Sequence, residues 1–171
     1  MLKKRIEEAL NKQINAEFWS AYLYLSMSAY FTNKNLPGFA NWMRIQFQEE
    51  TTHALKLFDY VGERGGKVKL EAIAEVKNDW AGPIEIFEDT LKHEQKVTTL
   101  INDLANIAME EKDHATANLL QWFVNEQVEE EANVEQILSH LKMVEGKGHG
   151  LFMLDNELKS RVFVDTTQQQ A

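Results

Sequence analysis

The chain lacks cysteine and has few of the residues that interrupt helices. Of its 171 residues none is cysteine, two are proline and eight are glycine. The absence of cysteine excludes disulfides, thiolate metal sites and iron–sulfur clusters. The scarcity of proline and glycine, together with 44% apolar residues, predicts long uninterrupted helices rather than a fold with many turns.

Long apolar runs are also missing. No stretch approaches the ~20 apolar residues of a membrane-spanning helix, and residues 1–8 contain acids where a secretory signal would be apolar. The formal net charge of −9 argues against a nucleic-acid partner held through its phosphates. We therefore expect a single-domain cytoplasmic protein with no membrane or nucleic-acid partner.

Four long stretches carry apolar residues at spacings of three and four, the period of a helix with one buried face. The expected helices run from about Lys4 to Thr32, from Pro37 to the glycines at 65 and 66, from Pro83 to a junction near Lys112, and from about Asp113 to Glu145. The two prolines suit first turns, and the glycine pair suits a helix end.

The lengths of the connections predict how these helices are arranged. Short loops make the first and second helices, and the third and fourth, antiparallel neighbours. The connection from Gly66 to Gly82, about seventeen residues, can extend ~55 Å, more than the ~42 Å length of a 28-residue helix. We expect an all-α four-helix bundle with one long crossover over residues 1–145.

The remaining residues are predicted to form an appendage to the bundle. Residues 146–163 contain a glycine turn and a short fifth helix, about Leu151 to Arg161, which needs a docking partner because it is too short to be stable alone. Residues 164–171 are expected to be a disordered tail.

A glutamate interrupts the apolar stripe of each long helix: Glu17, Glu50, Glu94 and Glu130. Counting from the loops places all four near the middle of the bundle. One unpaired buried carboxylate costs several kcal/mol, so four together would exceed the roughly 5–15 kcal/mol that holds a domain folded. A cationic partner is therefore expected among them, and a pair of divalent metal ions balances four negative charges.

Other polar side chains surround these glutamates. His53 lies one turn after Glu50, so that the two share a helical face, and Gln127 lies one turn before Glu130. Oxygen-rich ligation with one nitrogen suits Fe(II) or Mn(II), although Zn(II) would also bind. Tyr24, two turns beyond Glu17, fits either a role at the metal site or a buried tyrosine that merely satisfies its hydroxyl.

Three acids lie one position off the buried stripes: Glu49, Glu126 and Glu129. From spacing alone, a solvated helix face is favoured over a third, weaker metal position. The tryptophans are expected to serve packing or interfaces. The remaining histidines, which lack matching partners, are expected at the surface or in loops: His93, His114, His140 and His149.

These residues and this architecture resemble the ferritins, and within them the bacterial non-haem ferritins, over nearly the whole chain. The resemblance implies that Glu17, Glu50 and His53 hold a first iron. It implies that Glu50, Glu94 and Glu130 hold a second, with Glu50 bridging the two. The resemblance thus implies two irons per subunit.

The resemblance also assigns supporting roles. Gln127 resembles the glutamine that assists at the site, and Tyr24 resembles the tyrosine near the first iron. It further implies a third iron site built from four acids: Glu49, Glu126, Glu129 and Glu130.

Two departures from relatives matter. Bacterioferritins repeat the Glu-x-x-His motif on the fourth helix, where this chain has Gln127 and Glu130. They also use a methionine beside the first motif to bind haem, where this chain has Thr51 and Thr52. We therefore expect no haem.

The function implied is iron storage. Fe(II) would be oxidised to Fe(III) with O2 or H2O2 and deposited as mineral inside a homo-oligomeric shell of twenty-four copies, with the fifth helix at fourfold contacts. Two alternatives stay open. One is a diiron oxidase acting on an organic substrate, a class that usually has two Glu-x-x-His motifs. The other is a non-enzymatic helical assembly module whose core acids are protonated.

Overall fold

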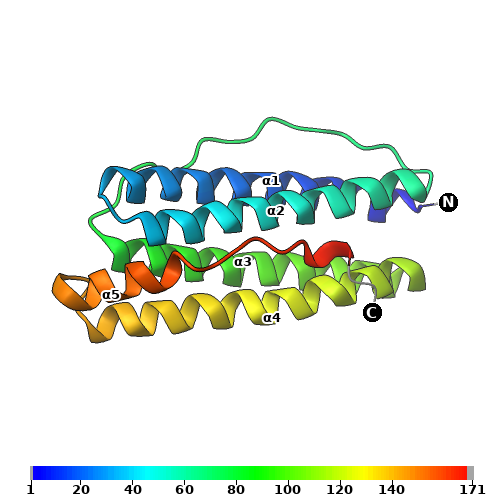
Figure 1. Cartoon of the computed structure of the whole chain (residues 1–171). Coiled ribbons are helices and arrows are strands. Elements are labelled where there is room, and N and C mark those ends of the chain that lie inside the picture. Colours follow the sequence, from blue (N-terminus) through cyan, green and yellow to red (C-terminus); the bar gives the residue numbers. More distant parts are fainter. Residues whose placement is uncertain (1, 169–171) are drawn as a thin grey trace.

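The computed structural model describes residues 2–168, and within this range the chain is helical with no strand. The elements are α1 (Lys4–Asn33), α2 (Pro37–Glu63), α3 (Pro83–Glu110), α4 (His114–Met143), α5 (Gly148–Leu158) and a 3₁₀ helix, η1 (Thr166–Gln168). The all-α bundle is confirmed (Figure 1), with helix bounds within a few residues of those predicted. None of the helices over residues 2–168 has a stretch long and apolar enough to cross a membrane.

The helix ends follow from local chemistry. Pro37 and Pro83 occupy the first turns of α2 and α3, where a missing N–H costs nothing. Asp113 caps α4 by accepting a hydrogen bond from the Thr116 N–H at 3.1 Å. Gly65, with φ of 69°, follows α2 in the left-handed conformation that glycine adopts without strain.

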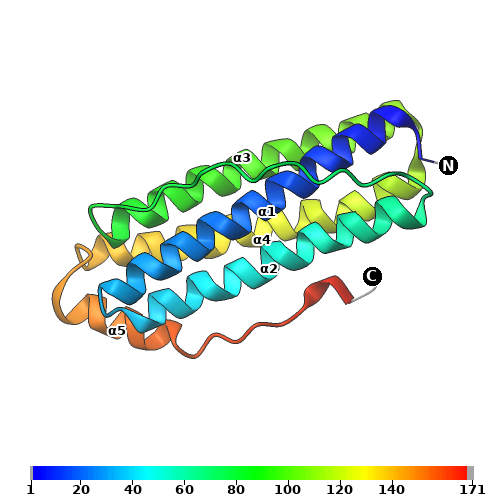
Figure 2. The same cartoon turned by 90° about the horizontal axis from the view of Figure 1, so that it is seen from above.

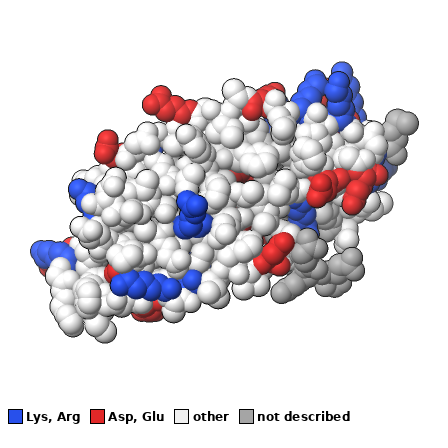
Figure 3. All heavy atoms as spheres, turned by 45° about the horizontal axis from the view of Figure 1, so that its top comes forward, with Lys and Arg blue, Asp and Glu red and all other residues white. Residues whose placement is uncertain are grey.

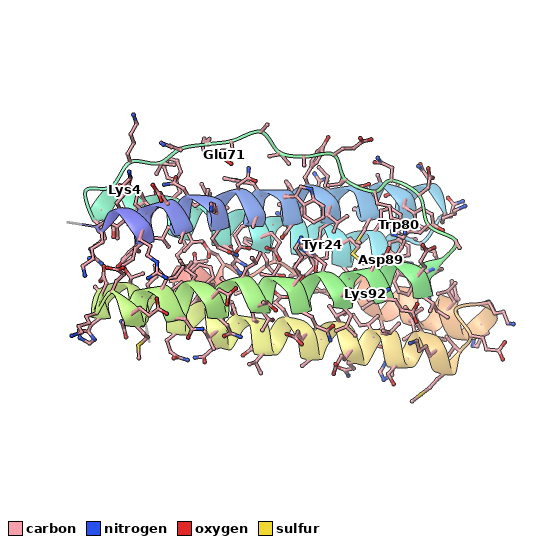
Figure 4. The ribbon with its side chains drawn as sticks, turned by 180° about the vertical axis from the view of Figure 1, so that it is seen from behind. Lys4, Tyr24, Glu71, Trp80, Asp89 and Lys92 are labelled. Carbon is pink, nitrogen blue, oxygen red and sulfur yellow. The ribbon has the colours of Figure 1, made fainter. Side chains whose placement is uncertain are left out.

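The long crossover runs along α1 and in the same direction (Figures 1 and 2). Near its start, the Lys69 N–H donates to Asn11 Oδ1 at 2.6 Å, and further on Ser26 Oγ donates to the Lys77 carbonyl at 2.8 Å. The crossover thus returns the chain to the end of the bundle where α2 begins, so α2 and α3 are parallel. At that end Trp80 and Asp89 lie side by side (Figure 4), with Trp80 Nε1 donating to Asp89 at 3.1 Å.

Two apolar clusters fill the bundle, one toward each end. The first includes Met27, Phe31 and Phe87, and the second includes Ile14 and Ile101. On every long helix the predicted core glutamate falls between the residues of one cluster and those of the other. The glutamates therefore form a polar layer near mid-bundle, as counting from the loops predicted.

Helix α5 docks on the start of α2. Asp155, which is 3% exposed, accepts hydrogen bonds from the backbone N–H groups of Gly38 at 2.7 Å and Phe39 at 3.1 Å. A carboxylate at a helix N-terminus satisfies donors that lack intrahelical partners. Within the chain, α5 thus docks on α2, and its predicted packing at a subunit interface stays a prediction.

The chain beyond α5 follows a path that the sequence did not indicate. Disorder was predicted from residue 164, but residues 159–168 lie along α2 (Figure 2). Lys56 on α2 donates to the Thr167 carbonyl at 2.8 Å. A tertiary contact of this kind does not produce a hydrophobic period in the sequence, so it could not be predicted from the polar segment. Residues 169–171, also predicted to be disordered, lie outside the described residues.

Candidate metal centre

Helices α1 and α2 bring together the first group of predicted ligands. Glu17, Glu50 and His53 are buried, with exposures of 1%, 1% and 3%, and each offers a ligand atom within 4.8 Å of the other two. His53 Nδ1 lies 3.8 Å from Glu50 Oε2. Over the described residues, this Oε2 is buried and has no hydrogen-bond partner. A buried carboxylate oxygen without a donor is well suited to a cation.

Helices α3 and α4 supply the second group, Glu94 and Glu130, both buried. The Tyr24 hydroxyl donates to Glu94 Oε1, and Figure 4 shows Tyr24 directed from α1 toward α3. Gln127 Nε2 donates to the other Glu94 oxygen at 3.2 Å. Four helices thus contribute side chains to one buried polar layer.

The ionisation of these glutamates is strongly disfavoured when no cation is present. Burial first, and then repulsion from Glu130, raise the pKa of Glu94 to about 8. Burial and the neighbouring Glu49 raise the pKa of Glu130 to about 7. The pKa of Glu50 is raised well above its ordinary value by burial and by the charges of Glu17 and Glu94. A divalent cation would remove this mutual repulsion, so the donor set fits a metal pair.

The three flanking acids are placed differently. Glu49 and Glu126 are half-buried and Glu129 is exposed. Glu49 Oε2 is paired with Arg161 Nη2 at 2.7 Å, and burial raises the pKa of both Glu49 and Glu126. Among residues 2–168, the group with metal-ligand spacing is the Glu17, Glu50 and His53 group. A third metal position therefore stays a prediction.

Sequence reasoning missed two buried glutamines. Gln13 Nε2 donates to Glu17 Oε1 at 2.8 Å, and Gln46 Nε2 donates to Glu130 Oε2 at 2.8 Å. Both are nearly inaccessible to solvent. Each lies four residues before a core glutamate, and this spacing on one helix face could have identified them.

The expectation that His93 lies at the surface or in a loop is wrong. His93 is in α3, half-buried, with Nε2 2.8 Å from Ser20 Oγ. Its ring centroid lies 5.2 Å from that of Trp19 and 6.4 Å from that of Tyr24. Burial and the charge of Lys96 lower the pKa of His93 to about 4. The imidazole in contact with the Tyr24 ring is therefore neutral at pH 7.

Two tryptophans pack directly against the centre. The ring of Trp42 is 6.4 Å from that of Tyr24, and the ring of Trp122 is 5.4 Å from that of His53. These contacts restrict the rings of Tyr24 and His53. The aromatic residues thus extend the apolar clusters up to the edge of the polar layer.

The four-helix fold and the layer of buried acids place the protein among the bundles that hold metal ions between facing helices. The sequence model of the ferritin-like domain matches residues 7–144. The chain belongs to the ferritin family.

Individual relatives agree with this assignment. The chain is similar to a bacterial non-heme ferritin of Bacteroides fragilis (strain 638R), with 44% identity over 94% of this chain and 100% of the relative. It is 38% identical to a bacterial non-heme ferritin of Staphylococcus aureus (strain MRSA252) over 95% and 98% of the two chains. An open pore ferritin from the hyperthermophilic archaeon Archaeoglobus fulgidus superimposes with a TM-score of 0.93 and 51% identity, covering 95% of this chain and 100% of the other.

Proposed function

We propose that the protein is an iron-storage ferritin that oxidises Fe(II) at the buried centre and stores the product as ferric mineral. Glu17, Glu50 and His53 would hold a first Fe(II), and Glu94 and Glu130 would hold a second, with Glu50 between them. Each Fe(II) gives up one electron, so a pair delivers two electrons to O2 or H2O2. The observation that carries the proposal is the buried ligand group Glu17, Glu50 and His53, in which Glu50 Oε2 has no hydrogen-bond donor among the described residues.

The surrounding residues support this chemistry. Neutral amides and a phenol, rather than lysine or arginine, donate to the core carboxylates. They orient the carboxylate oxygens without cancelling the negative charge that attracts the metal. Burial and the charges of the glutamates keep the pKa of Tyr24 well above its ordinary value, so its hydroxyl remains a donor to Glu94.

Assembly into a shell of twenty-four copies, and a cytoplasmic location, belong to the same proposal. In Figure 3 charged residues gather at one end of the surface shown, and wide uncharged areas separate the other charges. Exposed Leu70 and Ile73 on the crossover line a surface pocket of about 270 Å³ together with Phe18 of α1. Apolar groups gathered at a surface suit an interface between copies.

The direct test is Glu50→Ala. We expect the initial rate of Fe(II) oxidation to fall by roughly tenfold to a hundredfold, because this variant lacks the carboxylate proposed to lie between the two metal positions. Oxidation is followed by absorbance, and assembly by size exclusion. Asp59→Ala, which removes an exposed acid from the same helix, is the matched control and should keep the wild-type rate. A wild-type rate in Glu50→Ala would refute oxidation at this centre.

Storage needs a separate test. Fe(II) is added aerobically in large excess over the paired sites, and protein-bound Fe(III) is measured after size exclusion. We expect far more iron than a few ions per chain, eluting with a large particle. Uptake that stops at two or three ions on a small species would refute storage. It would favour a diiron oxidase acting on an organic substrate. A metal-free protein that binds no Fe(II) under anaerobic conditions would instead favour the assembly module with protonated acids.

A further inference from the structure

The segment after α5 covers one of the acids predicted for a third iron position. Arg161 Nη2 lies 2.7 Å from Glu49 Oε2, and the Arg161 guanidinium carbon lies 4.9 Å from the Trp42 ring centroid. Asn41 Nδ2 holds the backbone in place by donating to the Arg161 carbonyl at 3.0 Å. Figure 2 shows this segment running beside α2. We call residues 161–167 the strap.

The far end of the strap lies beside a second of these acids. Lys56 of α2 donates to the Thr167 carbonyl at 2.8 Å and lies 4.5 Å from the Trp122 ring centroid. Thr166, next to Thr167 in the strap, donates a side-chain hydrogen bond to Glu126, and the charge of Lys56 also acts on that carboxylate. The strap therefore contacts Glu49 on α2 through Arg161 and Glu126 on α4 through Thr166.

Arg161 does not use all of its hydrogen-bond donors. Its Nη1 atom is buried and has no hydrogen-bond partner over the described residues, although the side chain as a whole is 24% exposed. A buried unsatisfied donor costs free energy. The ion pair with Glu49 therefore occupies the carboxylate at 2.7 Å while leaving one donor of Arg161 unsatisfied.

We propose that Arg161 is the residue that sets the affinity of the third iron position, by occupying Glu49 until a metal ion displaces it together with the strap. This inference rests on the proposed function and, beyond it, on the predicted third metal position that includes Glu49. The guanidinium and the metal compete for one carboxylate, so the apparent metal affinity is reduced by the fraction of chains in which Arg161 holds it. The first two metal positions do not include Glu49, and Arg161 acts on them only through its charge near Glu130.

The first test is an anaerobic titration of the assembled, metal-free protein with Zn(II), which cannot be oxidised. In Arg161→Ala the third binding phase should tighten roughly threefold to tenfold, the range expected when a part-buried ion pair no longer competes. The first two phases should change less than the third, because Arg161 acts on the second position only through its charge near Glu130. Arg44→Ala, on the same helix as Glu49, removes an equal charge from a residue whose guanidinium lies 5.5 Å from the Phe47 ring centroid. It should leave all phases as in the wild type.

The second test follows the strap itself. The chain has no cysteine, so Val164→Cys gives one site for a spin label, at a side chain that is 54% exposed. We expect the label to become more mobile with the third Zn(II) per chain, and not with the first two. With Arg161→Ala added, the label should already be mobile before any metal is present.

The outcomes separate this inference from the function on which it rests. If Zn(II) does not fill two tight positions in the wild type, the paired centre fails, and the strap inference fails with it. If two tight positions fill and Arg161→Ala leaves the third phase unchanged or weakens it, only the strap inference is overturned. A label whose mobility ignores the third Zn(II) overturns it as well.

Discussion

Buried amides are the least expected feature of the centre at the level of single residues. Gln46 is fully buried and donates to Glu130 Oε2 at 2.8 Å. A neutral donor stabilises the ionised carboxylate without supplying a positive charge. Gln46 therefore lowers the free-energy cost of ionising Glu130, and the negative charge of the carboxylate stays available to a metal ion.

Gln46→Leu tests this role. At about pH 8 Glu130 is mostly ionised, because burial raises its pKa only to about 7. Loss of the donor should then destabilise the metal-free protein by roughly 1–3 kcal/mol. At about pH 5.5 the protonated carboxyl depends less on a donor, so the loss should be smaller. Thermal unfolding of metal-free protein at both pH values measures the difference.

Gln121→Leu is the matched control for this experiment, since Gln121 is exposed on α4. It should change the melting temperature little at either pH. Equal destabilisation by Gln46→Leu at both pH values would mean that the residue serves packing rather than the charge of Glu130.

At the scale of elements, the packing of α5 on α2 depends on the close approach of Gly38 to the backbone of Asp155. A Cβ atom added at Gly38 would lie 1.6 Å from the Asp155 carbonyl oxygen, so only glycine fits between α2 and α5. The same Gly38 N–H donates to the Asp155 carboxylate at 2.7 Å. The residue that admits α5 is therefore also one that binds it.

Gly38→Ala should push α5 away from α2 and destabilise the protein by roughly 1–3 kcal/mol, the usual cost of overpacking, which lowers the melting temperature by several degrees. The strap follows α5, so its contact with Glu49 should loosen as well. Gly62→Ala is the control, because nothing lies within 4 Å of a Cβ at that position of α2. It should be neutral or slightly stabilising. Equal melting temperatures for the two variants would show that the clash is relieved without undocking α5.

The elements also show what the sequence could and could not predict. Helix bounds and the height of the four glutamates were predictable, because Pro37, Pro83 and the helical period act within a few residues along the chain. The path of the strap was not, because it depends on Arg161 meeting Glu49, 112 residues away in sequence. His93 was misplaced for the same reason: its partner Ser20 lies on another helix.

At the scale of the whole molecule, a polar layer divides the core. Apolar clusters lie on both sides of the glutamates, so the bundle gives up continuous apolar packing at its centre. Without a cation, burial and mutual repulsion push the pKa values of Glu50, Glu94 and Glu130 upward. Metal-free protein is then held folded partly by protons that stand in for metal.

The stability of the metal-free protein should therefore fall as pH rises. Glu94 and Glu130 have ordinary pKa values of 4.5, which rise to about 8 and about 7 in the folded chain. A raised folded pKa means that the folded state binds more protons, so this stabilisation is complete below 4.5 and is lost as pH rises toward 8. Each additional bound proton changes the free energy of unfolding by roughly 1.4 kcal/mol per pH unit.

Zn(II) should reverse the trend. Protons compete with the metal for the same carboxylates, so the stabilisation by Zn(II) should grow as pH rises over this interval. Melting temperatures between about pH 5 and pH 9, with and without Zn(II), measure both slopes. Glu94→Gln removes one of the shifted groups and should flatten the metal-free slope. A metal-free melting temperature that stays level or rises from about pH 5 to pH 8 would mean that the core glutamates are ionised without a metal ion. Other charges in the chain, rather than protons at Glu94 and Glu130, would then have to balance them.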